Sequence, residues 1–277
     1  ETENDLTVKA NKRTFIFSKK DGQLKGVSVD NRKINFANGP RFIGARRADR
    51  SLDQFYNHDD EKAKEKDRTY SEFPDAAVFT KLDVKEDGGN LVVTANYKLG
   101  NLDKAQWTIN PSGELALDYT YNFSGVVDLM GIRFDYPEDQ VISKRWLGAG
   151  PYRVWQNRIH GTQYDVWEND YNDPIPGETF TYPEFKGYFG DVSWMNIQTK
   201  EGTISLTNET PDAYIGVYQP RDGRDRLLYT LPESGISVLN VIPPVRNKVN
   251  STDLCGPSSQ LKWVNGPQTG RVIFRFM

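Results

Sequence analysis

Apolar and polar residues alternate at every second position over long parts of this chain, and this pattern is the strongest constraint on its fold. Between residues 115 and 123, leucine, tyrosine and phenylalanine occupy every odd position, while smaller or polar residues occupy the even ones. Side chains of a β-strand point alternately to opposite faces, so a period of two is typical of a half-buried strand. Residues 91–97 repeat the pattern. No long amphipathic helix is apparent, and the chain is predicted to be all-β.

Short turn signals separate the candidate strands. Dipeptides such as Asp21-Gly22 and Gly88-Gly89 favour tight turns because glycine tolerates a positive φ. Many short strands joined by close turns indicate an antiparallel sandwich. Since no linker or internal repeat divides the chain, residues 1–277 are expected to form a single domain. Hairpins are predicted over residues 14–30, 80–97 and 105–123.

Composition argues against several classes of protein. The chain has 35 basic and 38 acidic residues and a net charge of −3, whereas nucleic-acid and anionic-membrane binders need a basic surplus. No apolar run approaches the ~18 residues that span a bilayer. The single cysteine, Cys255, allows no intramolecular disulfide. Because the chain starts at Glu1 without an initiator Met, it is expected to be a piece of something longer.

A turn dense in glycine and proline is the main candidate for a functional segment. Residues 146–151 read W-L-G-A-G-P, and Trp155, Asn157 and Arg158 follow shortly. Glycine and proline fix the backbone of such a turn. An aromatic ring, an amide and a guanidinium held on a rigid turn suit a sugar, which offers apolar C–H faces and hydroxyl groups. A purely structural turn between two strands is the alternative.

Three further segments accompany the G-x-G-P turn. They are Phe17-x4-Gly22-x-Leu24, Pro40-x6-Arg47-Ala48 and Pro183-x3-Gly187-x3-Asp191-Val192-x-Trp194. Together the four segments resemble the C-terminal β-sandwich, or "small chain" domain, of glycoside hydrolase family 2 β-galactosidases. The G-x-G-P segment resembles the family's G-x-G-P-x-x-x-Y-x-D-R, and the other three occur in the family's order and with its spacing.

This resemblance implies an antiparallel supersandwich with a galactose-mutarotase-like fold. It also implies a C-terminal accessory domain that packs beside a catalytic TIM barrel and completes one wall of the sugar pocket. The catalytic glutamates of the family lie in that barrel, which takes about 250 residues and is absent here. No catalytic residue is therefore expected in this chain. The implied partners are a carbohydrate and the catalytic domain of the parent chain, with no nucleic acid and no membrane, in a periplasmic or secreted protein.

The expected sugar-contacting residues are Arg47, Trp155, Asn157, Arg158 and, as a weaker candidate, Tyr188. The ring of Trp155 is expected to stack on a pyranose face. Arg47 and Arg158 would hydrogen-bond sugar hydroxyls or pin loops to the sandwich. Trp194 is expected in the core.

Departures from the family pattern fall on polar positions. Arg153-Val154-Trp155 replaces the usual Glu-Asn-Tyr, and Asn157 replaces the usual Asp, whereas the scaffold glycines and prolines persist. Galactose specificity therefore does not carry over from the resemblance, and a complete loss of sugar contact is equally compatible with these changes.

Two alternatives to the accessory role stay open. An aldose 1-epimerase shares the fold type and needs a histidine acid, for which the chain offers His58 and His160. His58 precedes three acidic residues and His160 precedes a glycine, so surface positions are expected for both. A purely structural domain without sugar binding is the second alternative.

Residues 165–185 are expected to form a long irregular stretch. Six oxygen-bearing side chains between Asp165 and Asp173 could hold Ca²⁺. Their spacing is not that of an EF-hand, which favours a solvated loop. No metal and no cofactor are therefore expected. The mixed charges of residues 59–68 likewise indicate a solvated loop or a short surface helix.

Overall fold

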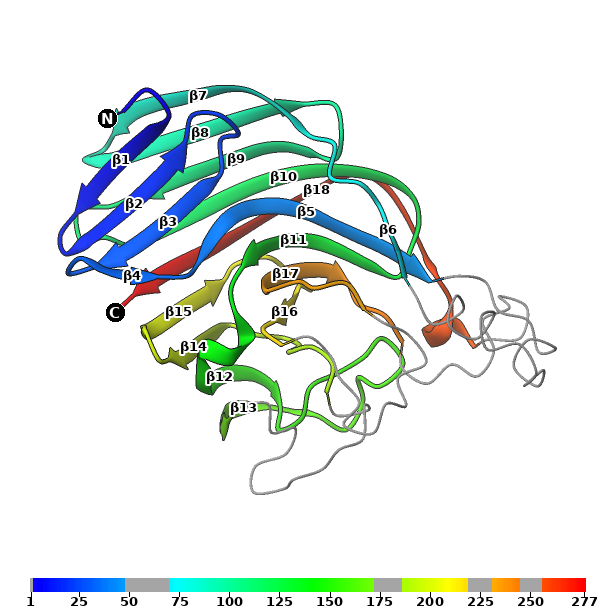
Figure 1. Ribbon diagram of the computed structural model, residues 1–277. Helices are drawn as coiled ribbons and strands as arrows, with labels where there is room; N and C mark the ends of the chain where they lie inside the picture. The colour runs from blue at the N-terminus through cyan, green and yellow to red at the C-terminus, as the bar shows by residue number, and fades with distance from the viewer. Residues whose placement is uncertain (1, 48–69, 172–185, 219–230, 245–255) are drawn as a thin grey trace.

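Two antiparallel β-sheets face each other in the computed structural model of the chain (Figure 1). The structure describes residues 2–47, 70–171, 186–218, 231–244 and 256–277. Within these ranges the only helical turns are η1 (Glu138–Gln140) and η3 (Pro257–Ser259), both of the 3₁₀ type. The all-β antiparallel sandwich expected from the alternating pattern is confirmed.

The first sheet has the order β1-β2-β3-β5-β11-β17-β16, with β4 added beside β3 and β6 beside β5. It is formed mainly by the N-terminal strands. Its strands are β1 (Asp5–Ala10), β2 (Arg13–Ser18), β3 (Leu24–Val29), β4 (Arg32–Ile34), β5 (Ala37–Arg47), β6 (Tyr70–Glu72), β11 (Leu129–Asp135), β16 (Tyr214–Gly216) and β17 (Ile236–Val241).

The second sheet has the order β13-β12-β14-β15-β18-β10-β9-β8-β7. The last strand in sequence, β18, therefore lies in the middle of this sheet, between β15 and β10. The strands are β7 (Val78–Asp87), β8 (Asn90–Lys98), β9 (Leu102–Ile109), β10 (Leu115–Val127), β12 (Val141–Gly150), β13 (Gln163–Asp170), β14 (Trp194–Thr199), β15 (Gly202–Asn208) and β18 (Lys262–Phe276).

Aromatic side chains from both sheets fill the space between them. The alternating residues of β10 behave as predicted, since all five odd positions from 115 to 123 are buried. Phe274 of β18 packs against Phe134 of β11 and against Phe36, with ring centroids 5.4 Å and 4.9 Å apart. Trp107 of β9 meets Phe134 edge-on at 6.0 Å. This shared core holds the two sheets together.

The three hairpins predicted from the turn signals are present as β2–β3, β7–β8 and β9–β10. Two other expectations need correction. The expected irregular stretch begins as a strand, because residues 165–170 belong to β13 and pair with β12; residues 172–185 lie outside the described ranges. Trp194 is only partly buried, because it lies on the face of β14 that points away from the core.

The turn of the first hairpin explains the Phe17-x4-Gly22-x-Leu24 segment. Phe17 and Leu24 are both buried. Gly22 adopts a φ of 74°, and a Cβ on this residue would lie only 2.7 Å from the ring of Phe79 on the other sheet. The segment therefore brings the turn against the second sheet, where only glycine fits.

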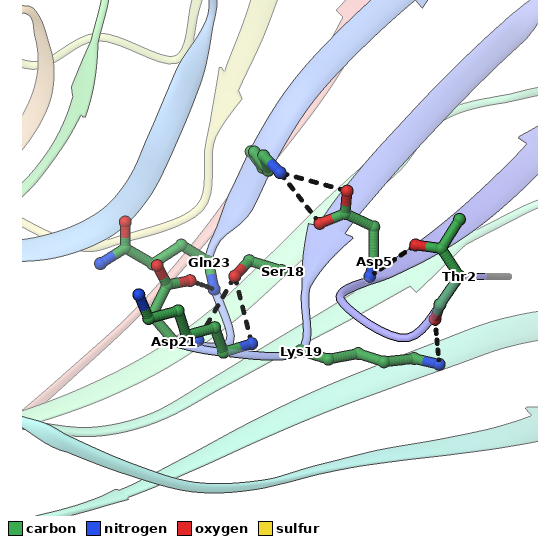
Figure 2. A network of polar contacts seen from close by, with 8 residues as sticks. Thr2, Asp5, Ser18, Lys19, Asp21 and Gln23 are labelled. Carbon is green, nitrogen blue, oxygen red and sulfur yellow. Dashed lines mark hydrogen bonds and ion pairs between the residues drawn. The ribbon is translucent and has the colours of Figure 1, made fainter.

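Polar contacts also hold the same turn in place (Figure 2). The hydroxyl of Ser18 accepts hydrogen bonds from the amides of Lys20 and Asp21, at 3.2 Å and 3.3 Å. The Asp21 carboxylate accepts one from the amide of Gln23 at 3.1 Å. Asp5, on the neighbouring β1, accepts from the ammonium group of Lys25. Side chains thus satisfy amides that the ladder leaves unpaired.

Candidate functional site

The G-x-G-P turn begins at the end of β12 and is shaped by a neighbouring indole. Trp167 of β13 lies across Gly150, where an added Cβ would be only 2.4 Å from Trp167 Cδ1. The indole nitrogen of Trp167 donates hydrogen bonds to the carbonyls of Gly148 and Gln163, both at 3.2 Å. Glycine is therefore needed at position 150 to admit the ring, and the ring in turn fixes the strand end.

The two family-like segments of the second half pair with each other in space. Val154, just after the G-x-G-P turn, exchanges backbone hydrogen bonds with Tyr188 at 2.6 Å and 2.8 Å. The amide of Ala149 donates to the carbonyl of Gly190 at 2.9 Å. At Gly187, an added Cβ would be 2.0 Å from the Val154 carbonyl oxygen. The G-x-G-P segment and the segment around Gly187 therefore form one structural unit.

Trp155 and Tyr188 form the packed interior of this unit. Each is only 1% exposed, and their rings meet edge-to-face with centroids 5.8 Å apart. They belong to a second, smaller apolar cluster that includes Ile43 and Leu129. In this arrangement neither ring offers a face to a sugar, because core side chains occupy the space that a pyranose would need. Trp155 and Tyr188 therefore support the turn by packing beneath it in the core.

Asn157 and Arg158 lie at the surface of the same turn. Arg158 is exposed and Asn157 is half-buried. The amide of Arg158 donates to the carbonyl of Trp155 at 2.9 Å, which closes a tight turn around residues 156 and 157. Of the residues expected to contact sugar, the structure thus brings Trp155, Asn157, Arg158 and Tyr188 together, with two of them buried and two accessible.

Hydrogen bonds fasten this turn to the C-terminal part of the chain. The Gln156 amide donates to the carbonyl of Pro243 at 3.0 Å, and its side-chain amide donates to the carbonyl of Gln260 at 2.9 Å. Asn157 Nδ2 donates to Ser259 Oγ at 3.4 Å. Segments separated by about a hundred residues therefore hold Asn157 and Arg158 in place.

Several expectations fall outside what the structure describes. The backbone of Arg47 ends β5 opposite Tyr70, but its side chain is not among the described atoms. His58 and residues 59–68 lie outside the described ranges. His160 is described and exposed.

A pair of buried cations close to the turn was not anticipated. Lys144 and Arg153 are 1% and 2% exposed. Both approach the ring of Tyr218, with the Lys144 nitrogen 5.2 Å and the Arg153 Cζ 5.0 Å from its centroid. Burial lowers the pKa of Arg153 to about 10, although the nearby Tyr218 and Glu138 partly offset this effect. Cation–π contacts compensate part of the desolvation cost. No local pattern in the sequence marks these two residues as buried.

The expected calcium segment is partly described. Asp165, Glu168 and Asp170 lie on β13, where successive side chains alternate between faces; Asn172 and Asp173 lie outside the described ranges. Among the residues that the structure describes, no group of three His, Cys, Asp or Glu side chains is arranged to hold a metal ion. None of the described helical segments is long and apolar enough to cross a membrane.

Comparisons with known proteins give a family for the chain. A search of curated protein sequences found no match. Among similar solved structures, galactose 1-epimerase from Lactobacillus acidophilus is 9% identical with a TM-score of 0.48, and the alignment covers 99% of this chain and 94% of that one. A GalM/aldose epimerase homologue from C. elegans is 6% identical with a TM-score of 0.45, and the alignment covers 99% of this chain and 98% of that one. Alpha-N-acetylgalactosaminidase NagBb from Bifidobacterium bifidum is 11% identical with a TM-score of 0.46, and the alignment covers 98% of this chain and 36% of that one. The family model described as beta galactosidase small chain matches residues 9–240, which include all four segments noted in the sequence. The chain therefore belongs to the beta galactosidase small chain family.

Proposed function

We propose that this chain is the carbohydrate-contacting accessory domain of a glycoside hydrolase, and that it packs beside a catalytic TIM barrel supplied by the rest of the parent protein. The observation that carries the proposal is the family match over residues 9–240. The accessible polar edge of the G-x-G-P turn supports it, because that edge is held rigidly from two distant parts of the chain. A periplasmic or secreted location is part of the same proposal.

In this role Asn157 and Arg158 would supply the polar edge of the sugar pocket. A guanidinium donates several hydrogen bonds in a fixed geometry, and an amide both donates and accepts. Both groups therefore suit the hydroxyls of a sugar ring. Trp155 and Tyr188 would act indirectly, by fixing the turn from below. The general acid and the nucleophile would come from the catalytic domain, as glycoside hydrolysis needs two opposed carboxylates.

The epimerase alternative is not favoured by the family match. The described residues also add no support for it, because His160 lies exposed beyond the turn. The accessory role is therefore proposed in preference to the epimerase, and the kinetic test below distinguishes it from a purely structural domain.

The test is a kinetic comparison in the full-length parent enzyme. For the aryl glycoside that the wild type hydrolyses best in a panel of aryl glycosides, Arg158→Ala should raise KM by about tenfold and leave kcat nearly unchanged, since a wall residue contributes to the binding of substrate and transition state alike. Arg145→Ala is the matched control, because Arg145 is an exposed arginine on β12. An unchanged KM in Arg158→Ala would contradict the proposed pocket edge. Turnover by this chain alone would contradict the accessory role.

A further inference from the structure

Trp263 is the most exposed tryptophan of the chain. It is 71% exposed, whereas Trp107, Trp146 and Trp155 are each at most 1% exposed. Trp263 lies near the start of β18, directly opposite Val126 of β10. The next residue, Val264, packs against the core between the sheets. Because neighbouring side chains of a strand point to opposite faces, the indole stands on the outer face of the second sheet.

Uncharged polar side chains continue from this indole along the same face of the sheet. Two pairs further along the ladder, at the next position on this face, Ser124 lies opposite Asn265, and the Ser124 hydroxyl donates to Asn265 Oδ1 at 2.9 Å. After two more pairs, Asn122 lies opposite Pro267 on the same face. All four residues are exposed. The surface thus combines one large aromatic ring with a hydroxyl and two amides on a regular sheet.

This combination fits a sugar better than it fits a protein partner. A pyranose has an apolar C–H face that can lie on an indole and a rim of hydroxyls that can bond to amides. The centre of a protein interface is enriched in apolar and aromatic residues, whereas here the ring is flanked by serine and asparagine. An amphipathic ring with polar neighbours is therefore suited to a small polyhydroxylated ligand.

We propose that Trp263, with Ser124, Asn122 and Asn265, forms a glycan-binding platform on the outer face of the second sheet. Its ligand is one pyranose unit of an oligosaccharide or polysaccharide. The proposal rests on the carbohydrate-contacting role of the domain. It assigns a second set of contacts, made by residues other than Asn157 and Arg158.

The experiment measures glycan affinity of this chain by isothermal titration calorimetry and by affinity electrophoresis. The probes are soluble β-galactan and galactotetraose. Trp263→Ala should lower the affinity for both probes by about tenfold or more, and Trp263→Phe should restore most of it because a flat ring remains. The unfolding midpoint of both variants should equal that of the wild type, since the side chain is exposed.

Two further variants separate this proposal from the proposed function. Tyr164→Ala removes another aromatic ring, 58% exposed, from β13 of the same sheet and should leave the affinity unchanged. If Trp263→Ala weakens binding while Arg158→Ala does not, the platform stands and the pocket edge at the turn falls. If only Arg158→Ala weakens binding, the platform is overturned and the proposed function survives. If the wild type binds neither probe, the platform is overturned. It is also overturned if Trp263→Ala leaves glycan affinity intact but releases the chain from its catalytic domain.

Discussion

At the scale of single residues, Tyr119 is a buried phenol in an unusual position. It lies on β10 and crosses Gly270 of β18, where an added Cβ would be 2.2 Å from the phenolic oxygen. The hydroxyl is buried, and among the residues that the structure describes it makes no well-formed hydrogen bond, although the Thr210 hydroxyl lies close to it. The neighbouring Thr210 hydroxyl already donates to the carbonyl of Arg271 and accepts from its amide, both at 3.0 Å. Burial raises the pKa of Tyr119 to about 12, and Thr210 partly opposes this shift.

Tyr119→Phe should therefore change stability in a pH-dependent way. Near neutral pH the variant should be as stable as the wild type or up to ~1 kcal/mol more stable, because a buried hydroxyl without a well-formed hydrogen bond is removed. From pH 10 to pH 12 the unfolded phenol loses its proton while the folded one keeps it. Tyr119 therefore destabilises the native wild type progressively, by up to ~2–3 kcal/mol at the top of this range.

Urea unfolding of both proteins at pH 8 and pH 11 checks this expectation. The free energy of unfolding of the wild type should fall more than that of Tyr119→Phe over this interval. Parallel losses in the two proteins would show that the phenol of Tyr119 ionises as readily in the folded state as in the unfolded one.

At the scale of elements, the junction between β12 and β13 depends on the close approach of Trp167 to Gly150. Gly150→Ala should lower the free energy of unfolding by about 1–3 kcal/mol, because the new methyl group would overlap the indole and displace it. The variant should also weaken sugar binding at Asn157 and Arg158 if the indole fixes the turn. Chemical denaturation measures the loss of stability, and calorimetric titration of the same preparation with a sugar ligand measures the loss of affinity.

Gly256→Ala provides a matched comparison. No atom of the described residues lies within 4 Å of the place that an added Cβ would take at Gly256, and its φ of −63° is one that any residue adopts. This substitution should change stability by less than about 0.5 kcal/mol. A similar loss in both variants would mean that the overlap with Trp167 is not the cause.

The elements that could be predicted from the sequence are those whose local pattern and packing agree. The alternation from residue 115 to 123 and the Asp21-Gly22 turn gave strands and hairpins because neighbouring residues decide both features. The role of Trp155 could not be predicted in this way. Its burial depends on the pairing of Val154 with Tyr188, which lies far along the chain. Similarly, nothing local distinguishes buried Trp155 from exposed Trp263.

At the scale of the whole molecule, the contact between the two sheets rests on the aromatic cluster around Phe274. This side chain is fully buried and touches rings from the opposite sheet. Phe274→Ala should lower the free energy of unfolding by about 3–5 kcal/mol, through lost burial and the cavity left between the sheets. Denaturant unfolding followed by far-ultraviolet circular dichroism measures the change.

Trp263→Ala is the natural control, because Trp263 lies on the same strand with its side chain in solvent. It should cost less than about 0.5 kcal/mol. A cost as large as that of Phe274→Ala would show that Trp263 contributes to packing, and the platform would then have to be abandoned.

The family and the sandwich architecture were accessible from the sequence because glycines and prolines at close approaches tolerate little change. Gly150 and Gly187 illustrate this, since each lies where a Cβ would overlap another residue. The polar residues were less predictable. Arg153 departs from the family pattern, and only the folded arrangement shows that it lies buried against Tyr218. A charged residue in a turn is ordinarily read as a surface residue.

The central position of β18 has a consequence for the order in which the protein is made. β10 and β15 are both synthesised well before the strand that joins them in the sheet. On the ribosome each therefore presents an unpaired strand edge until β18 emerges, and such edges recruit other chains. Ribosome pausing before β18 would prolong the time during which these edges are exposed, whereas a chaperone that covers strand edges would protect them from other chains.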